Sequence, residues 1–257
     1  MYREQKLQEE QYILPYHWFL DVASWRGRVY YGCIKKCLDL FLAEAKGMNE
    51  PRILDAGCGD GFILGELKKL GFKDLYGVDY SEKAVNFAKL LVPEAKFSVD
   101  DLSNLSYPDG FFGAIFLVDV LEHILSGRLE VVLKSIHRVL SRGGILIVFV
   151  PSIAEPIGQK HFQHFSEESI KSFLSGLFSI QKIVGQNKKT FLEVIYKILD
   201  NRFWEIKRLS RWYNLIIWPK FFNDCSPSKA KRIILLCKKI EALAGDYQKL
   251  HSFGKPH

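Results

Sequence analysis

A glycine-rich segment carries the first chemical signal in this sequence. Gly57, Gly59 and Gly61 form the pattern GxGxG directly after the apolar residues 53–54, and Asp55 precedes them. Glycines at such a point permit a tight turn and let a ligand approach backbone amides at the start of a helix. The carboxylate of Asp55 would repel a pyrophosphate but attract an ammonium or a sulfonium. The segment therefore favours a positively charged cofactor with an amino-acid group.

Acidic residues follow four of the strands that we expect. Asp79 comes about 20 residues after the glycines, where an acid can accept two hydrogen bonds from ribose hydroxyls. The other acids at strand ends are Asp55, Asp100–Asp101 and Asp119. Because ligands in open α/β sheets bind beyond the carboxyl ends of the strands, we expect these acids to line one ligand site.

The elements that would position these acids alternate between strand and helix. We expect strands at 52–55, 75–78, 96–99, 114–118 and 145–150, and helices at 61–70, 81–91 and 129–140. The later strands are continuously apolar, which is typical of strands covered on both faces. Ser81 and Ser166 are suited to cap helices, because their hydroxyls can accept from a free amide of the first turn. The sequence thus predicts an α/β fold with a doubly wound, mostly parallel sheet.

Five segments in register resemble the class I S-adenosylmethionine-dependent methyltransferases. They are residues 54–61, 76–81, 101–110, 119–124 and 142–147. The resemblance covers residues 50–185 and implies a Rossmann-like methyltransferase fold with a seven-stranded sheet. It also implies S-adenosylmethionine as the cofactor.

The resemblance implies roles for the residues around the methionine part of that cofactor. Asp55 would face the methionine ammonium. The backbone of Gly57, Cys58 and Gly59 would pass under the methionine and the ribose. Asp119 would border the sulfonium and open the pocket for the methyl acceptor.

It also implies roles around the nucleoside. Asp79 would hold the ribose hydroxyls, and Tyr80 would pack beside the adenine. Asp101 would accept from the adenine amino group, and Leu102 would offer its backbone amide. Asp100 competes with Asp101 for this role, and the spacing from residues 108–110 favours Asp101.

Three histidines are candidates for a general base, which methyl transfer needs only if the acceptor arrives protonated. His123 follows the fourth strand, and His161 and His164 follow the fifth, on the same edge of the sheet. We expect His123 and His164 to be catalytic, with His161 as the substitute. A surface or helix-capping role stays open for each of them.

Residues 119–123 are similar to the ExxEH segment of quinone-biosynthesis O-methyltransferases and small-RNA 2′-O-methyltransferases, where it helps to hold a divalent metal. Here the first position is Asp119, and many relatives with a similar segment use no metal. We therefore predict no metal. The five cysteines form no CxxC pair, so neither a zinc ribbon nor a thioredoxin-type redox pair is indicated.

The positive charge lies at the C-terminal end of the sequence. Residues 186–257 carry 15 Lys and Arg against 6 Asp and Glu, whereas residues 1–185 carry 21 against 23. The stretch 188–224 reads as basic, aromatic, amphipathic helices. These could form a cap over the pocket or a peripheral contact with a membrane. Nucleic acid is not expected, since no RNA-binding module accompanies the charge.

We divide the chain into an N-terminal helical segment (1–48), the cofactor-binding core (49–186), and a basic aromatic insertion with a last strand and tail (187–257). Helical spacing predicts a helix over 12–46, whose first aromatic residues form either the other wall of the pocket or part of the core. Residues 232–238 fit the last strand or one face of a helix.

The sequence therefore predicts a methyltransferase that acts on a small-molecule or lipid-linked acceptor, with oxygen favoured over nitrogen and carbon. A nucleotide-dependent oxidoreductase is one alternative, although GxGxG in place of GxGxxG and the adjacent Asp55 count against it. A cofactor-binding protein without catalysis is the other. The polar first residues contain no signal-peptide pattern, so we expect a cytoplasmic protein, with contact to the membrane surface as an option.

Overall fold

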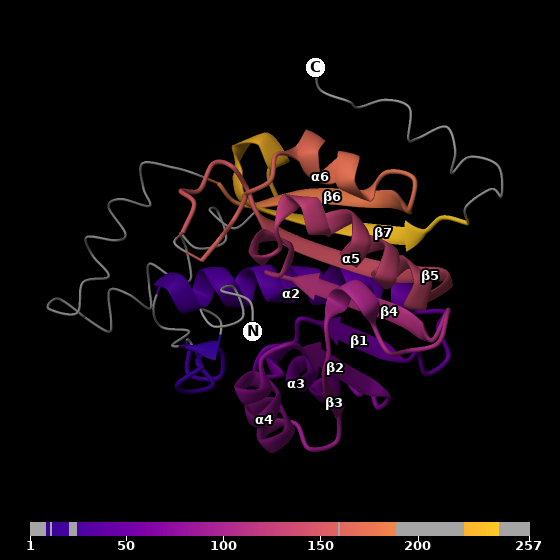
Figure 1. Ribbon diagram of the computed structural model, residues 1–257. Helices are drawn as coiled ribbons and strands as arrows, with labels where there is room; N and C mark the ends of the chain where they lie inside the picture. Colours follow the sequence, from indigo (N-terminus) through magenta and orange to yellow (C-terminus); the bar gives the residue numbers. More distant parts are fainter. Residues whose placement is uncertain (1–8, 11, 21–24, 159, 189–223, 242–257) are drawn as a thin grey trace, which may run out of the picture.

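The computed structural model describes residues 9–10, 12–20, 25–158, 160–188 and 224–241. Its centre is a seven-stranded sheet with helices on both faces (Figure 1). The strands are β1 (Ile53–Ala56), β2 (Leu75–Asp79), β3 (Lys96–Val99), β4 (Phe112–Val118), β5 (Leu140–Pro151), β6 (Phe178–Lys188) and β7 (Ala230–Lys239). The helices are α2 (Trp25–Ala45), α3 (Phe62–Lys69), α4 (Glu82–Leu91), α5 (Ser126–Val139) and α6 (Glu167–Leu174). Three short 3₁₀ turns are η1 (Leu102–Asn104), η2 (Leu121–His123) and η3 (Pro227–Lys229).

The strand order is β3-β2-β1-β4-β5-β7-β6. Strands β1 to β5 pair in parallel, and β7 is antiparallel to both of its neighbours. The chain runs outward from β1 in one direction through β2 and β3, and in the other through β4 and β5. The carboxyl ends of β1 and β4 therefore flank the point where the order reverses, which is the place where open α/β sheets bind ligands. This confirms the predicted doubly wound, Rossmann-like fold.

The apolar strands are covered on both faces, as their composition predicts. Along β4, Ala114 and Phe116 pack with residues of α2 and α3. Ile115 and Leu117 point to the other face and pack with residues of α5 and α6. Because successive side chains of a strand alternate between faces, a strand that is buried twice needs apolar residues throughout.

Two predicted helix caps are present. The Ser81 hydroxyl accepts a hydrogen bond of 3.1 Å from the Ala84 amide at the start of α4. At the start of α6, Ser166 and Ser169 each accept from the other's backbone amide, which is the reciprocal arrangement of a capping box. These local signals fix where the two helices begin.

The predicted helix over 12–46 is wrong in its first part, because α2 begins at Trp25 and residues 12–20 form turns. Trp18 N donates to Pro15 O at 3.1 Å, which is a turn and not a helical hydrogen bond. His17 N donates to Asp60 Oδ2 at 3.0 Å. A contact with the glycine-rich segment therefore replaces the helical hydrogen bond that the apolar spacing suggested. We call residues 12–20 the N-terminal strap.

Residues 232–238 lie in β7, so the strand alternative is confirmed and the helix alternative is wrong. β7 pairs with β5 on one side and β6 on the other, and Ile233, Ile234 and Leu235 are fully buried. A central strand uses its backbone hydrogen bonds on both sides, and this outweighs a helical spacing of apolar residues.

The basic aromatic stretch falls almost wholly outside the described residues, since 189–223 are not among them. Its predicted amphipathic helices, with Trp204, Trp212 and Trp218, therefore stay predictions. No helix in the described part of the chain combines the length and the hydropathy that crossing a membrane requires.

Candidate active site

A cavity of about 650 Å³ opens at the carboxyl ends of β1, β2, β4 and β5. Ten of the residues predicted from the sequence line it, namely Asp55, Gly57, Cys58, Gly59, Asp79, Tyr80, Asp101, Leu102, Asp119 and His123. His161 lines it as well, whereas His164 is not among the lining residues. Residues from five separate parts of the sequence thus meet in one cavity, which the sheet topology explains.

The glycine-rich loop has the conformation that its composition predicts. Gly57, Gly59 and Gly61 have φ values of 86°, 52° and 80°. Residues with side chains seldom adopt this left-handed region. A Cβ at Gly57 would lie 2.5 Å from Val120 Cγ2, so the close packing also requires glycine. The loop leaves room beside its backbone for a ligand at the start of α3.

Asp55 is suited to hold an ammonium. Its side chain is 1% exposed, and its Oδ2 has no hydrogen-bond partner in the described structure. Burial raises the pKa of Asp55 well above its ordinary value, and the nearby Asp79 and Asp60 raise it further. A buried acceptor without a donor is costly. A cationic ligand in the cavity would supply both the charge and the donor, so the methionine ammonium of S-adenosylmethionine fits this position.

Asp79 joins the glycine-rich loop to the second strand. Its Oδ2 accepts from Gly59 N at 2.9 Å, and its Oδ1 accepts from Ser81 N at 2.9 Å. Burial raises the pKa of Asp79 to about 6, although these backbone hydrogen bonds oppose the rise. The Tyr80 backbone also donates to this carboxylate, whose remaining acceptor capacity is suited to a ribose hydroxyl.

The structure separates the two candidates for the adenine. Asp101 lines the cavity, where its carboxylate also accepts from Ser103 N at 2.8 Å and from the Arg128 guanidinium at 2.9 Å. Asp100 is not a lining residue, and its carboxylate accepts from the backbone amides of Asp101 and Ser106. Of the two, Asp101 is the one that lines the cavity, and its role toward the adenine stays a prediction.

The N-terminal strap covers the glycine-rich loop. The sequence predicted that these residues form either a wall of the pocket or part of the core, but it did not predict the contacts that hold them. His17 Nδ1 lies 2.9 Å from Asp60 Oδ1. Trp18 Nε1 donates to Asp60 O at 3.0 Å. Asp60 is fully buried, and Tyr12 and Tyr16 line the cavity. The polar Asp60 inside the glycine pattern was the signal that could have predicted a partner.

Asp119 lies at the end of the cavity where the sequence predicts the methyl acceptor, and its φ of 51° is unusual for a residue with a side chain. Glu122 lies beside it and is 1% exposed. Burial and the neighbouring Asp119 raise the pKa of Glu122. Sequence reasoning named Glu122 in a motif but did not predict that it would be buried in the cavity.

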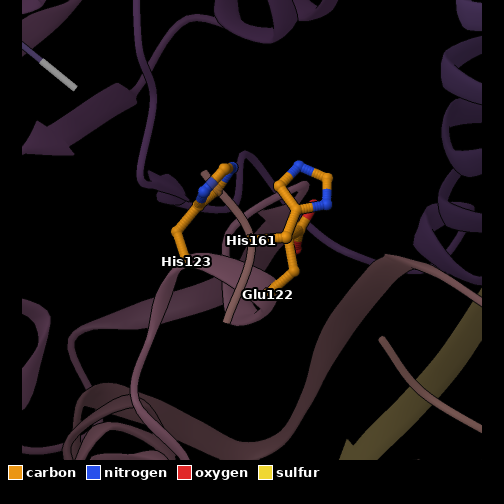
Figure 2. Close-up of side chains that lie close together, drawn as sticks. All are labelled: Glu122, His123 and His161. Carbon is orange, nitrogen blue, oxygen red and sulfur yellow. The ribbon is translucent and has the colours of Figure 1, made fainter. Parts of the chain in front are cut away.

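His123 and His161 lie close to Glu122 (Figure 2). The centroids of the two imidazole rings are 4.8 Å apart, and the rings are nearly perpendicular. The loop after β5 brings His161 there, because Phe162 N donates to Glu122 O at 2.9 Å and Gln163 Nε2 donates to Ile124 O at 2.8 Å. Burial lowers the pKa of His123, and burial and the neighbouring histidines lower that of His161 to about 4. Both imidazoles are therefore neutral near pH 7.

Hydrogen bonds fix which nitrogen of each imidazole carries the proton. His123 Nδ1 lies 3.0 Å from Lys160 O, and His164 Nδ1 lies 2.9 Å from Glu155 O. Carbonyl oxygens only accept, so both Nδ1 atoms carry protons, and in the neutral imidazoles both Nε2 atoms carry lone pairs. His161 Nδ1 lies 2.7 Å from His164 Nε2, so it must donate to that lone pair. His123 and His161 thus each keep an unprotonated Nε2.

Arg232 and Glu155 complete the cavity from β7 and from the loop after β5, and sequence reasoning did not predict either. Both line the cavity and form an ion pair with each other. The charges of Asp119 and Glu122 also raise the pKa of Arg232. No motif marks these residues, because their meeting depends on the insertion of β7 between β5 and β6.

Residues 54–148 match the family described as "Methyltransferase domain". Together with the Asp55 position and the glycine-rich loop, this match assigns S-adenosylmethionine as the cofactor and counts against the oxidoreductase alternative.

Among curated proteins, the chain is 28% identical over 162 residues to EEF1A lysine methyltransferase 4 of Mus musculus, covering 57% of this chain and 58% of that protein. It is 39% identical over 100 residues to 2-methyl-6-phytyl-1,4-hydroquinone methyltransferase of Synechocystis, covering 37% of this chain and 30% of that protein. The chain thus spans less than two thirds of these relatives.

Among solved structures, N-methyltransferase NodS from Bradyrhizobium japonicum, in complex with S-adenosyl-l-homocysteine, has the same fold. The TM-score is 0.64 at 15% identity, over 93% of this chain and all of that chain. A SAM-dependent methyltransferase from Archaeoglobus fulgidus gives a TM-score of 0.57 at 19% identity, over 80% of this chain and 93% of the other.

Proposed function

We propose that this chain is a class I S-adenosylmethionine-dependent methyltransferase. It transfers a methyl group to a hydroxyl oxygen of a small-molecule or lipid-linked acceptor, and the match of residues 54–148 to a methyltransferase domain supports this. The observation that carries the proposal is the pair of neutral imidazoles beside Asp119, each with an unprotonated Nε2. A nitrogen or carbon nucleophile with a free electron pair needs no base, whereas a hydroxyl does. The Synechocystis relative, named as a hydroquinone methyltransferase, supports an oxygen-bearing small molecule.

The cofactor would supply a methyl group on a sulfonium sulfur, which departs as a neutral thioether without further activation. Asp55 and Asp79 hold the two ends of the methionine and ribose part, and Asp119 lines the cavity where the acceptor enters. Orientation supplies much of the rate in such a transfer. With the cofactor bound, the acceptor oxygen would take the methyl carbon as the carbon–sulfur bond breaks, and His123 Nε2 would accept the hydroxyl proton. S-adenosylhomocysteine and a methyl ether are the products.

His161 is the second proton acceptor, and His164 positions it. The short hydrogen bond between His161 Nδ1 and His164 Nε2 orients the His161 ring. Replacement of His123 or His161 by Gln should lower turnover by about 10²–10⁴-fold and leave the Kd for S-adenosylmethionine unchanged. His137→Gln is the matched control, because His137 lies outside the cavity and contacts Ile240 O.

A protein lysine is the second candidate acceptor. The mouse relative is named as a lysine methyltransferase. The acidic Asp119 and Glu122 at the acceptor end could also hold an ammonium before it loses its proton. A transfer assay with labelled S-adenosylmethionine, run on separate metabolite, lipid and protein fractions, decides between the candidates. An alkali-stable labelled ether in the first two fractions supports the proposal, and labelled methyl-lysine in the protein fraction contradicts it.

We also propose that the basic aromatic stretch 188–224 brings the protein to an anionic membrane surface. Its tryptophans and its excess of Lys and Arg support this, since indole rings favour the interface and cations are attracted to anionic lipid. A lipid-linked acceptor would then reach the cavity without leaving the bilayer surface.

A further inference from the structure

The start of β7 brings two cations to the carboxyl edge of the sheet. Because β7 is antiparallel to β5, its first residues, and not its last, lie beside the end of β5. Arg232 pairs with Pro151, and Ser152 N donates a hydrogen bond of 2.8 Å to Lys231 O. Both cationic side chains line the cavity, although Lys231 is only 8% exposed. A sheet edge that otherwise carries acids thus receives positive charge.

The guanidinium of Arg232 has unused hydrogen-bond donors. Its Nη1 contacts the Glu155 carboxylate and lies 3.4 Å from Lys231 O. Within the described residues, no hydrogen bond uses its Nε or Nη2. The side chain is 24% exposed where it lines the cavity. A guanidinium holds five N–H donors in a planar fork that matches the oxygens of a carboxylate or a phosphate. The unused donors are therefore suited to an oxyanion in the cavity.

Asn187 adds a polar group from the neighbouring strand. In β6 it lies between the two residues that pair with Arg232 and Ala230 of β7. It is 7% exposed, lines the cavity and has a φ of 56°. Asn adopts this left-handed conformation more readily than most residues, and such conformations gather at ligand sites. Its carboxamide N–H groups can donate to an anion, so two adjacent strands present donors to one part of the cavity.

Positive charge exceeds negative charge around this part of the cavity. The acids and the basic side chains that line it here are Asp119, Glu122, Glu155, Lys160, Lys231 and Arg232. Burial and the neighbouring Asp119 raise the pKa of Glu122, which favours its neutral form. Asp119 is expected to face the sulfonium of the cofactor. Glu155 is then the acid that opposes three cations, so this part of the cavity attracts an anion.

The Arg232 charge lies close to a proposed base and to an apolar wall. Burial lowers the pKa of His161, and the charge of Arg232 adds to this effect. Burial raises the pKa of Cys33 in α2, and the charge of Arg232 opposes the rise. Cys33 lines the cavity together with the apolar Val29 and Phe149. This end therefore fits a molecule with a hydroxyl, an apolar body and an anionic group.

We infer that the methyl acceptor carries an anionic group, a carboxylate or a phosphate, which Arg232 binds together with Asn187 and Lys231. The inference rests on the proposed function, because it names the class of hydroxyl compound that this function methylates. A neutral analogue would leave the donors of a half-buried guanidinium unpaired and would bind more weakly. An anion held at Arg232 also orients the acceptor hydroxyl, so Arg232 determines specificity.

The charge of the labelled product tests the acceptor class. Wild type is incubated with methyl-labelled S-adenosylmethionine and the metabolite and lipid fractions of the source cells, and the labelled ether is applied to an anion exchanger at about pH 7. Methylation of the hydroxyl leaves the anionic group in place, so we expect retention. Retention that is lost at about pH 3 indicates a carboxylate, whose ordinary pKa is about 4, whereas retention that persists indicates a phosphate. A labelled ether that the exchanger does not retain at about pH 7 overturns the inference.

Variants of the full chain test the role of Arg232 with the acceptor purified from the labelled fraction. Arg232→Gln should raise the acceptor KM by about 10–100-fold, the effect of a lost hydrogen bond to a charged group, and leave the Kd for S-adenosylmethionine unchanged. Arg232→Lys keeps the charge without the planar fork and should give an intermediate KM. Arg142→Gln is the matched control, because Arg142 forms an exposed ion pair with Glu241 outside the cavity.

Glu155→Gln separates anion binding from a purely structural role, since it breaks the same ion pair but keeps the guanidinium. It should lower the acceptor KM, because a carboxylate that competes for Arg232 is removed. An unchanged KM in Arg232→Gln, or an equal rise of the KM in Glu155→Gln, overturns the inference. Failure of the proposed function gives a different result, namely no labelled ether in either fraction although calorimetry shows that the cofactor binds.

Discussion

The backbone N–H of Gly59 donates a hydrogen bond of 2.9 Å to Asp79 Oδ2, which ties the glycine-rich loop to the end of β2. The other oxygen of the same carboxylate accepts from Ser81 N, where α4 begins. One buried side chain thus holds both the glycine-rich loop, which lines the cavity, and the start of α4. A ribose that binds Asp79 meets a carboxylate whose position is already fixed, so little ordering is required on binding.

Asp79 should make cofactor binding depend on pH. Because burial raises its pKa to about 6, a fall from about pH 8 to about pH 5 protonates the carboxyl and removes acceptor capacity for the ribose. The Kd for S-adenosylmethionine, measured by calorimetry, should therefore rise over this range. Asp79→Asn should bind more weakly at pH 8 and show a flatter profile. Equal slopes for wild type and variant would contradict the role.

The raised pKa of Asp79 should also make the stability of the cofactor-free protein depend on pH. Stability should increase as the pH falls, whereas the affinity for the cofactor should decrease. The folded-state pKa of Asp79, about 6, exceeds the ordinary value of 3.8, so the folded state binds the proton more tightly than the unfolded state. The free energy of unfolding of wild type, relative to Asp79→Asn, should increase as the pH falls from about 6 to about 4. Urea unfolding of both proteins across this window measures the difference, and a decrease would refute the shift.

Asp55 should contribute to binding at the expense of stability. Its Oδ2 is buried and unpaired, so Asp55→Asn removes a charge that costs free energy in the unliganded protein. We expect the variant to unfold at equal or higher urea concentration. Its affinity for S-adenosylmethionine should fall by about 1.5–3 kcal/mol, the range for a hydrogen bond to a charged group. Wild-type affinity in a folded variant would show that the ammonium binds elsewhere.

Gly57 and Gly71 form a matched pair that separates backbone strain from packing. Their φ values are 86° and 93°, so alanine at either position is strained by about 1–2 kcal/mol. A Cβ at Gly57 also meets Val120 Cγ2 at 2.5 Å, whereas a Cβ at Gly71 meets nothing within 4 Å. Gly57→Ala should therefore lower the free energy of unfolding more than Gly71→Ala and alone abolish cofactor binding. Equal losses would mean that the loop can shift to accept the side chain.

His17 and Asp60 should hold the N-terminal strap over the cofactor loop. The His17 ring and its backbone N–H contact different oxygens of the buried Asp60 carboxylate, at 2.9 Å and 3.0 Å. His17→Ala should increase cleavage within 12–20 during limited proteolysis and speed the release of bound cofactor. Lys35→Ala is a suitable control, because the exposed pair of Lys35 and Asp39 lies outside the cavity. An unchanged cleavage rate would show that Trp18 and the tyrosines hold the strap without His17.

The basic aromatic stretch gives a prediction from the sequence alone. Wild type should float with anionic liposomes at low salt and lose this binding at high salt, since each Lys or Arg near the surface adds about 1 kcal/mol of attraction. A variant with both Trp212→Ala and Trp218→Ala should bind more weakly. No flotation at low salt, with normal methylation of a soluble acceptor, would leave the stretch as a cap over the pocket.

The sequence by itself determined the architecture and most of the residues that line the cavity at the carboxyl ends of the strands. Apolar runs such as 114–118 and 145–150 predicted buried parallel strands. The glycines and acids come directly after predicted strands in the sequence, so their place at the strand ends could be predicted as well. These features are local: a tight turn needs glycine where it occurs, and a strand end places the next residue at the sheet edge whatever lies far away in sequence. Asp55, Asp79 and Asp119 could therefore be predicted together.

The tertiary structure decided which distant groups meet. Helical spacing over 12–46 predicted one helix, but Asp60 attracts His17 and Trp18, and the strap follows that contact. β7 enters between β5 and β6 and carries Arg232 to Glu155. The loop after β5 places His161 against Glu122. Such pairings depend on how the whole chain packs, and a buried carboxylate left without a donor has no signature in the residues that precede or follow it.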